Sequence, residues 1–278
     1  MTSPPRTQAG PGWPAGPSQF RPAPGAAPLT RMVAAQASLE ARTLVRNGEQ
    51  LLLILVIPVL LLVGFSLEKF INIAANTRLD RMARVDFLVP GIIALAIMST
   101  AFTSQAIATG FERRYGVLKR LGATPLSRVG LIAAKTCTVI AVELAQVVII
   151  VGVGLALGWR PHTTAAGVVW AVLLVAVGTA AFSGLALLLA GTLRAEATLA
   201  AANLIYLVLL GVGGVLFSLD KFPPGARGPL KLLPSGALSD GLHSVLQHAG
   251  GVPAADLAVL AVWAAVAIGL AARTFKWE

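Results

Sequence analysis

The sequence predicts an all-α integral membrane protein with six transmembrane helices. The 278 residues are 56% hydrophobic and only 12% charged, and the mean hydropathy is +0.79. This composition is more apolar than the core of a soluble domain requires. Six stretches of the chain also approach the length of about 20 apolar residues that a helix needs to cross the hydrocarbon core. A lipid bilayer is therefore the expected surroundings of most of the chain.

Residues 1–28 are predicted to be a disordered, Pro/Gly-rich tail on the cytoplasmic side. They contain eight prolines and four glycines and offer few apolar side chains for a core. About 50 mostly polar residues precede the first apolar run, so no cleavable secretory signal is expected. A proline-rich ligand for a partner domain is the alternative interpretation of this composition.

Residues 29–46 have the period of an amphipathic helix. Leu29, Val33 and Leu44 fall on one side of such a helix, while its arginines fall on the opposite side. We therefore expect an N-terminal helix that lies in the membrane interface rather than crossing the bilayer. Glu40 interrupts the apolar side of this helix.

Six segments are predicted to cross the membrane as helices. Their approximate bounds are 50–67, 87–109, 136–158, 165–190, 197–219 and 253–272. The first is the shortest and contains Pro58, which a membrane helix tolerates when neighbouring groups satisfy the freed carbonyl. Residues 220–252 are too polar to cross the bilayer. They keep enough apolar side chains for one or two short helices that dip into the outer leaflet.

The distribution of basic residues predicts a multi-pass protein of the cell membrane with both termini in the cytoplasm. This orientation places more Lys and Arg in the cytoplasmic segments than in the external ones, as the positive-inside rule expects. The external loop 68–86 is the weakest point of the assignment because it holds four basic residues. The net charge of +10 fits anionic lipid headgroups better than nucleic acid, since the basic residues flank apolar runs. No nucleic-acid partner is expected.

Residues 111–135 are unusually rich in charge for a loop between two spans. On a helix, Phe111, Tyr115 and Leu118 would share one face, and the charged side chains would point away from it. A glycine weakens this helix, and Pro125 would end it, since proline disfavours helical geometry at the preceding residue. Two interpretations stay open. The helix could offer its charges to a soluble partner, or the loop could be a positive-inside segment that only fixes topology.

The order of residues in this loop resembles that of a transporter family. Glu112-Arg-Arg-Tyr-Gly116, Leu118-Lys-Arg-Leu121 and Thr124-Pro125-Leu-Ser-Arg128 resemble the E-x-x-x-G-x-L-x-x-L-x-x-T-P-x-x-R loop of type-2 ABC exporter permeases, particularly the daunorubicin-resistance-like drug efflux branch. The resemblance extends over most of residues 29–278. In that family this segment is the cytoplasmic coupling helix, which docks in a groove of the nucleotide-binding subunit. The resemblance implies an ATPase-docking role for Glu112, Arg113, Arg114, Tyr115, Gly116, Leu118, Lys119, Arg120 and Pro125.

The resemblance implies a permease subunit of an ATP-driven ABC exporter. The chain has no G-x-x-x-x-G-K-[ST] motif to hold nucleotide phosphates, so the ATPase is expected on a separate partner chain. The family implies two ATP-binding subunits and a second permease copy or a sibling permease. Lipophilic drug-like or lipid-like molecules are the expected substrates, and a polysaccharide or lipid-linked envelope precursor is the alternative. Outside the family, the alternatives are a proton-coupled secondary transporter and a membrane scaffold without transport.

Three polar residues inside the predicted spans are candidates for the substrate path. Glu143 lies deep in an apolar run, and Gln146 follows about one turn later. An intramembrane carboxylate is costly and usually faces the bundle interior or a wet cavity. We hypothesise that Glu143 lines the substrate path and favours cationic amphiphiles. The alternative is a structural hydrogen bond to another helix, and both interpretations also apply to Asn203 in the fifth span.

No cofactor, metal or catalytic site is expected. His243 and His248 are five residues apart and do not share a helix face as a zinc pair would. Ser239 and Asp240 lie near His243, but adjacency in sequence is not the geometry of a catalytic triad. The single cysteine, Cys137, cannot form an internal disulfide.

Overall fold

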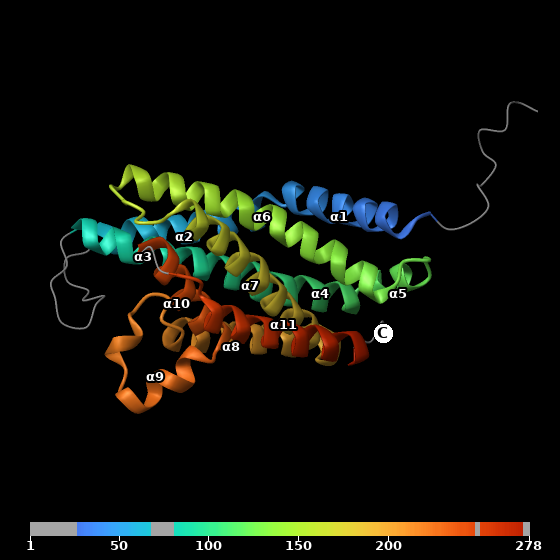
Figure 1. Ribbon diagram of the computed structural model, residues 1–278. Helices are drawn as coiled ribbons and strands as arrows, with labels where there is room; N and C mark the ends of the chain where they lie inside the picture. The colour runs from blue at the N-terminus through green and yellow to red at the C-terminus, as the bar shows by residue number, and fades with distance from the viewer. Residues whose placement is uncertain (1–26, 68–80, 248–250, 275–278) are drawn as a thin grey trace, which may run out of the picture.

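The computed structural model describes residues 27–67, 81–247 and 251–274, and these residues form helices and connecting turns without a β-strand. Figure 1 shows the long helices running side by side. The predicted all-α fold class is confirmed. The helices are α1 (Leu29–Arg46), α2 (Gly48–Leu67), α3 (Arg81–Ile97), η1 (Met98–Ser104), α4 (Gln105–Arg114), α5 (Val117–Gly122), α6 (Arg128–Ala156), α7 (Ala165–Thr192), α8 (Ala195–Val212), η2 (Leu219–Lys221), α9 (Pro224–Lys231), α10 (Pro234–Gln247) and α11 (Ala254–Thr274).

Within the described residues, five helical segments are long and apolar enough to cross a membrane. They are Arg84–Arg114, Val129–Ala156, Ala165–Thr192, Ala195–Val212 and Ala254–Thr274. These segments correspond to the second to sixth predicted spans, and they make the chain an integral membrane protein. The first predicted span lies in α2, whose described apolar part, Ile54–Leu67, is shorter than a bilayer crossing requires. The predicted tail falls outside the described residues except for its last two positions.

The segments α3, η1 and α4 follow one another without a break and form the central helix of the bundle. This helix packs against α2, α6, α7, α8 and α10, and most of its side chains are buried. The π-helical stretch η1 interrupts the α-helical hydrogen-bond pattern of this helix. Short π-helical stretches inside α-helices are frequently found at functional sites. Thr100 in η1 is buried and donates a hydrogen bond of 2.9 Å to the side chain of Gln146 in α6. The central helix therefore carries polar groups into the apolar bundle.

The amphipathic helix predicted at 29–46 is present as α1 with the same bounds. It lies along α6, and none of its residues is fully buried (Figure 1). Leu39 and Val45 are exposed, whereas Met32 and Val33 pack against apolar side chains near α5. This distribution fits a helix with one face on the bundle. The position of α1 in the membrane interface stays a prediction.

The fifth span is shorter than predicted. We expected it to cover 197–219, whereas α8 ends at Val212. Gly214 then has a φ of 66°, in the left-handed region that other residues rarely adopt. A Cβ atom on Gly213 would collide with the side chain of Ser235 in α10. The chain therefore turns at these glycines, although its apolar composition continues beyond them.

Residues 220–252 contain the predicted short helices, α9 and α10. α10 is packed into the end of the bundle against α3, α7 and α11. The ring nitrogens of His243 lie 2.6 Å from the carbonyl oxygen of Ser239 and 2.9 Å from that of Phe87. Over the part of the chain that the structure describes, no group of three His, Cys, Asp or Glu residues could hold a metal. The position of α9 and α10 in the outer leaflet stays a prediction.

The two ends of the bundle differ in the elements they carry (Figure 1). The beginning of α1, the short helix α5 and the end of α11 lie at one end. The beginning of α3 and the helices α9 and α10 lie at the opposite end. The described chain therefore begins and ends on one side, as the predicted topology requires. That this side is the cytoplasmic one stays a prediction.

Candidate functional site

The charged segment after the second span forms two helices instead of one. α4 ends at Arg114, and α5 covers Val117–Gly122. Between them Gly116 has a φ of 71°, which glycine adopts without the steric cost that a Cβ atom would bring. The prediction of one continuous helix with Tyr115 and Leu118 on a shared face is therefore wrong. The turn at Gly116 gives these two side chains different surroundings.

Tyr115 and Leu118 have opposite environments. Tyr115 is 68% exposed, and its ring stacks on that of Phe111 with the centroids 6.1 Å apart. Leu118 is completely buried and attaches α5 to α6, α7 and α11. It does so through a set of apolar side chains that we call the α5 anchor cluster: Leu118, Leu126, Leu131, Leu187 and Ala271. Through Leu118, the short helix thus shares one buried apolar cluster with three long helices.

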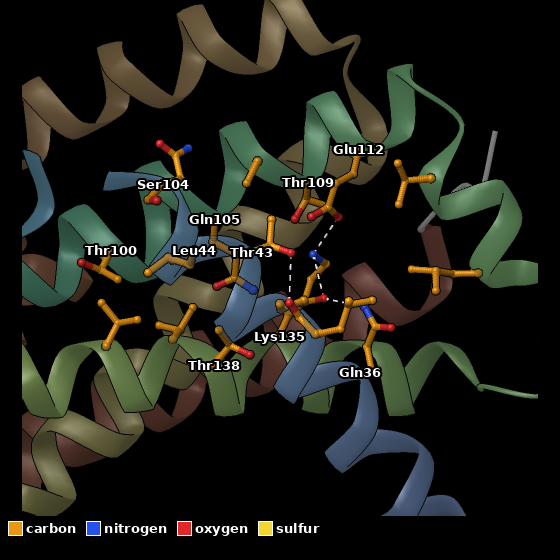
Figure 2. Close-up of a pocket in the computed structure, with 18 residues that line it drawn as sticks. Gln36, Thr43, Leu44, Thr100, Ser104, Gln105, Thr109, Glu112, Lys135 and Thr138 are labelled. Atoms are coloured by element: carbon orange, nitrogen blue, oxygen red, sulfur yellow. Dashed lines mark hydrogen bonds and ion pairs between the residues drawn. The ribbon is translucent and has the colours of Figure 1, made fainter. Parts of the chain in front are cut away.

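A buried lysine links α4 to α1 and α6 (Figure 2). Lys135 of α6 is only 4% exposed, and its Nζ lies 2.7 Å from Glu112 of α4 and 3.2 Å from Glu40 of α1. Gln36 donates a hydrogen bond of 2.9 Å to the same oxygen of Glu40. We call Glu40, Glu112 and Lys135 the ion triad. Because Lys135 is shielded from water and both carboxylates are only partly exposed, removing one partner would leave poorly compensated charge inside the protein.

Two arginines that follow Glu112 link α4 to the next two long helices. Arg113 donates a hydrogen bond of 2.8 Å to the carbonyl oxygen of Ala190 near the end of α7. Arg114 pairs with Glu196 at the beginning of α8. The second pair is exposed on both sides, and such pairs contribute little to stability. Glu112 and Arg113 therefore face neighbouring helices rather than the solvent side expected for a partner.

The exposed side chains around α5 form the surface that a soluble partner could reach. Tyr115, Lys119, Arg120 and Pro125 are exposed at the end of the bundle. The hydroxyl of Thr124 donates a hydrogen bond of 2.6 Å to the carbonyl oxygen of Leu121, where α5 ends. This local bond and the following proline hold the exposed turn in place. We call Tyr115, Lys119, Arg120 and Pro125 the α5 surface.

Sequence comparison relates this arrangement to known transport proteins. Residues 70–273, well over half of the chain, match the family described as ABC-2 family transporter protein. The chain belongs to the ABC-2 transporter family. Members of this family supply a membrane permease domain and not the ATPase, so the chain is an ABC permease domain. No curated protein matches the sequence. The match includes α5 and two members of the ion triad, while Glu40 precedes it.

Inside the ABC-2 permease bundle, Glu143 and Gln146 bond to neighbouring helices. Glu143 is almost completely buried, and one of its carboxylate oxygens accepts a hydrogen bond from Thr179 of α7. The other oxygen has no partner among the residues that the structure describes. Gln146 accepts the bond from Thr100 and donates one of 2.9 Å to the carbonyl oxygen of Ile54 in α2. These contacts agree with the structural alternative for both residues.

Asn203 lies apart from these two residues. It is exposed on α8, where its amide donates a hydrogen bond of 3.0 Å to the carbonyl oxygen of Leu199 in the same helix. Leu204 and Leu207 are also exposed on this helix. The structure therefore does not bring the three predicted path residues together. Glu143 and Gln146 face the interior of the permease, and Asn203 faces outward.

The pairing of Lys135 with two carboxylates could not be predicted from the sequence. In the sequence, Lys135 is only one of the basic residues of the charged loop, and Glu40 only interrupts an apolar helix face. An acidic residue on the inner side of an amphipathic helix does carry a signal, because an unpaired carboxylate there would be costly. That signal indicates that Glu40 has a basic partner, but it does not identify which residue the partner is. The three-dimensional packing of α1, α4 and α6 identifies Lys135.

Proposed function

We propose that this ABC-2 permease is the membrane subunit of an ATP-driven exporter of the daunorubicin-resistance-like branch. It moves lipophilic drug-like or lipid-like molecules out of the cytoplasm. Two copies of a separate ATP-binding subunit supply the energy, and a second permease copy or a sibling permease completes the pathway. The protein lies in the cell membrane with both termini in the cytoplasm.

The attachment of α4 and α5 to the rest of the bundle supports this proposal most strongly. The ion triad joins α4 to α1 and α6, and Arg113 joins it to α7. The α5 anchor cluster adds a contact with α11. A displacement of α5 by a partner would therefore act on several packed helices at once. Packed helices switch between discrete arrangements rather than deforming gradually, which is what a transport cycle requires.

The chemistry of the α5 surface suits a docking site for a soluble subunit. Tyr115 is a large exposed aromatic side chain, and Arg120 lies nearby in the next helix. Tyrosine and arginine are among the residues that are enriched at the positions that carry most of the binding energy in protein interfaces. A partner groove with an apolar slot and acidic side chains would complement this surface. Glu112 and Arg113 contribute by holding α4 in position, and Gly116 by turning the chain.

Co-purification in a mild detergent tests this docking site. We expect the ATP-binding subunit to co-purify with the tagged wild-type chain and to be lost from the Tyr115→Ala/Arg120→Glu variant. Arg160→Glu is the matched control, because Arg160 is exposed in the turn after α6, at the end of the bundle opposite α5. Equal recovery of the ATPase with the double variant and the control would refute docking at α5.

A proton-coupled secondary transporter is the second candidate function. Glu143 supports it. This carboxylate is buried in a span, and one of its oxygens has no hydrogen-bond partner among the described residues, so it could bind and release protons. Transport that requires a proton gradient and proceeds without ATP would favour this candidate. If Glu143→Gln left both the substrate range and the transport rate unchanged, Glu143 would have no role in the path.

A further inference from the structure

A cavity of about 310 Å³ lies between α1, the central helix and α6 (Figure 2). Glu112 and Lys135 lie toward one side of it, and Thr100, which bonds to Gln146, lies toward the other. The apolar part of the lining includes Leu44, Val139 and Val142. This volume is at the lower end of the range for small-molecule sites. A cavity lined by both charged and apolar groups suits a ligand that is itself amphipathic.

Two polar side chains in this lining are buried without a hydrogen-bond partner in the described part of the chain. Gln105 is 6% exposed, and neither its amide oxygen nor its amide nitrogen is bonded. The hydroxyl of Thr109, about one turn later on α4, is also unbonded. Buried polar groups are nearly always hydrogen-bonded, because leaving them unbonded is destabilising. Both residues line the cavity, but their unbonded atoms have almost no exposed surface, so a ligand could supply the missing bonds once rotation about the side-chain bonds turns these atoms toward it.

The charges of the lining favour a cation. Its charged side chains are Glu40, Glu112 and Lys135, so two carboxylates face one ammonium group. Lys135 contacts one oxygen of each carboxylate, and within the described residues the second oxygen of each has no bonded donor. A positively charged headgroup could bond to these oxygens and balance the excess negative charge. An anionic headgroup would instead be repelled.

We propose that this cavity binds amphiphiles with an ammonium headgroup. The headgroup donates hydrogen bonds to Glu40, Glu112 and the amide oxygen of Gln105, and the apolar body lies along Val139 and Val142. The inference rests on the proposed function, because it specifies the substrate class that the exporter would take up. The ammonium group could belong to a transported amphiphile or to an ethanolamine lipid of the bilayer. The cavity is separate from the α5 surface and from the buried carboxylate of Glu143.

Three probes with the same tail and different headgroups test this site. Binding of dodecylammonium, dodecanol and dodecyl sulfate is measured on the full-length permease in phosphatidylcholine nanodiscs without the ATPase. We expect saturable binding of dodecylammonium, at least about tenfold weaker binding of dodecanol, and no saturable binding of dodecyl sulfate. Equal binding of the three probes, or no saturable binding of dodecylammonium, would overturn the proposal.

Variants of the two unbonded residues separate ligand binding from a structural role. Gln105→Leu and Thr109→Val should each weaken dodecylammonium binding by about tenfold. Neither should lower the melting temperature, because each removes a group without a partner among the described residues. Ser183→Ala is the matched control: it also removes an unbonded buried hydroxyl, but outside the cavity, and should leave binding unchanged. Unchanged affinity in both cavity variants would overturn the proposal.

The lipid composition of the nanodiscs identifies the source of the ammonium group. If replacing phosphatidylcholine by phosphatidylethanolamine abolishes dodecylammonium binding, the site is occupied by the bilayer lipid. If the affinity is unchanged, the site takes a separate amphiphile. Both results support an ammonium site. The binding assay contains no ATPase, so its failure would refute the ammonium site alone. Failure of the co-purification test would instead refute the docking of an ATPase at α5, and the two failures are therefore distinguishable.

Discussion

The ion triad predicts that replacing Lys135 alone lowers the stability of the protein more than removing all three charges does. Lys135→Met removes the only charge that pairs with Glu40 and Glu112 within the triad, while both carboxylates keep limited contact with water. Breaking a buried ion pair from one side typically costs about 3–5 kcal/mol. The carboxylates are 16% and 28% exposed, so we expect a reduced loss of about 2–3 kcal/mol in the free energy of unfolding.

Thermal unfolding of the purified permease in detergent measures this loss. The expected decrease in Tm for Lys135→Met is about 5–10 °C. The variant Lys135→Met/Glu40→Gln/Glu112→Gln removes all three charges and should recover most of the decrease, because no uncompensated charge remains. Arg114→Met is the control for an exposed pair and should change stability by less than about 1 kcal/mol.

Two results would refute this account of the ion triad. An unchanged Tm in Lys135→Met would mean that the buried lysine contributes nothing to stability. An equal decrease in the single and triple variants would mean that Lys135 acts through the packing of its alkyl chain rather than through its charge. The expected recovery in the triple variant distinguishes these explanations.

The remaining predictions concern the α5 segment and the polar groups in the spans. Leu118→Ala should destabilise the protein by about 2–4 kcal/mol, since it removes the central side chain of the α5 anchor cluster; an unchanged Tm would contradict the attachment. Gly116→Ala has free space around the new methyl group but must adopt a φ of 71°, so a loss of about 1 kcal/mol in the same assay is expected and a gain would refute the argument. Gln146→Leu removes the bonds to Thr100 and to the Ile54 carbonyl and should cost about 1–3 kcal/mol; a Tm equal to that of the wild type would show that these bonds are replaced by water.

The helical fold could be predicted because a membrane restricts the chain strongly. A spanning segment must satisfy its own backbone hydrogen bonds over about 20 apolar residues, so hydropathy alone locates most of the long helices. The bounds of α1 followed from its period. The sequence predicts an end of the fifth span beyond that of α8, because the run stays apolar past Gly213 and Gly214. Hydropathy does not show where the chain changes direction within an apolar run.

The conformation of the charged loop depended on contacts that the sequence does not show. The sequence predicts only that Gly116 weakens a helix, whereas in the structure Gly116 separates two helices. The direction of α5 depends on Leu118, which is buried among side chains from three distant helices. Local helix period therefore gave the wrong face for this residue, because tertiary packing overrides local preference in a short helix.

The candidate site shows the same limit for polar residues. Lys135 and Glu112 are 23 positions apart in the sequence, and Glu40 lies on a third helix. One sequence gives their charges but not their pairing. Hydropathy likewise placed both Glu143 and Asn203 inside spans without giving the direction of their side chains. The structure directs the first inward and the second outward.

We propose that this permease couples outward transport to ATP hydrolysis on a partner chain. The most direct test uses inside-out membrane vesicles that contain the permease and its co-purifying ATPase, with the lipophilic cation rhodamine 6G as the probe. We predict uptake of the probe that requires ATP, continues when a protonophore removes the proton gradient, and falls strongly in Tyr115→Ala/Arg120→Glu. Uptake that needs the proton gradient and proceeds equally well without ATP would contradict the account.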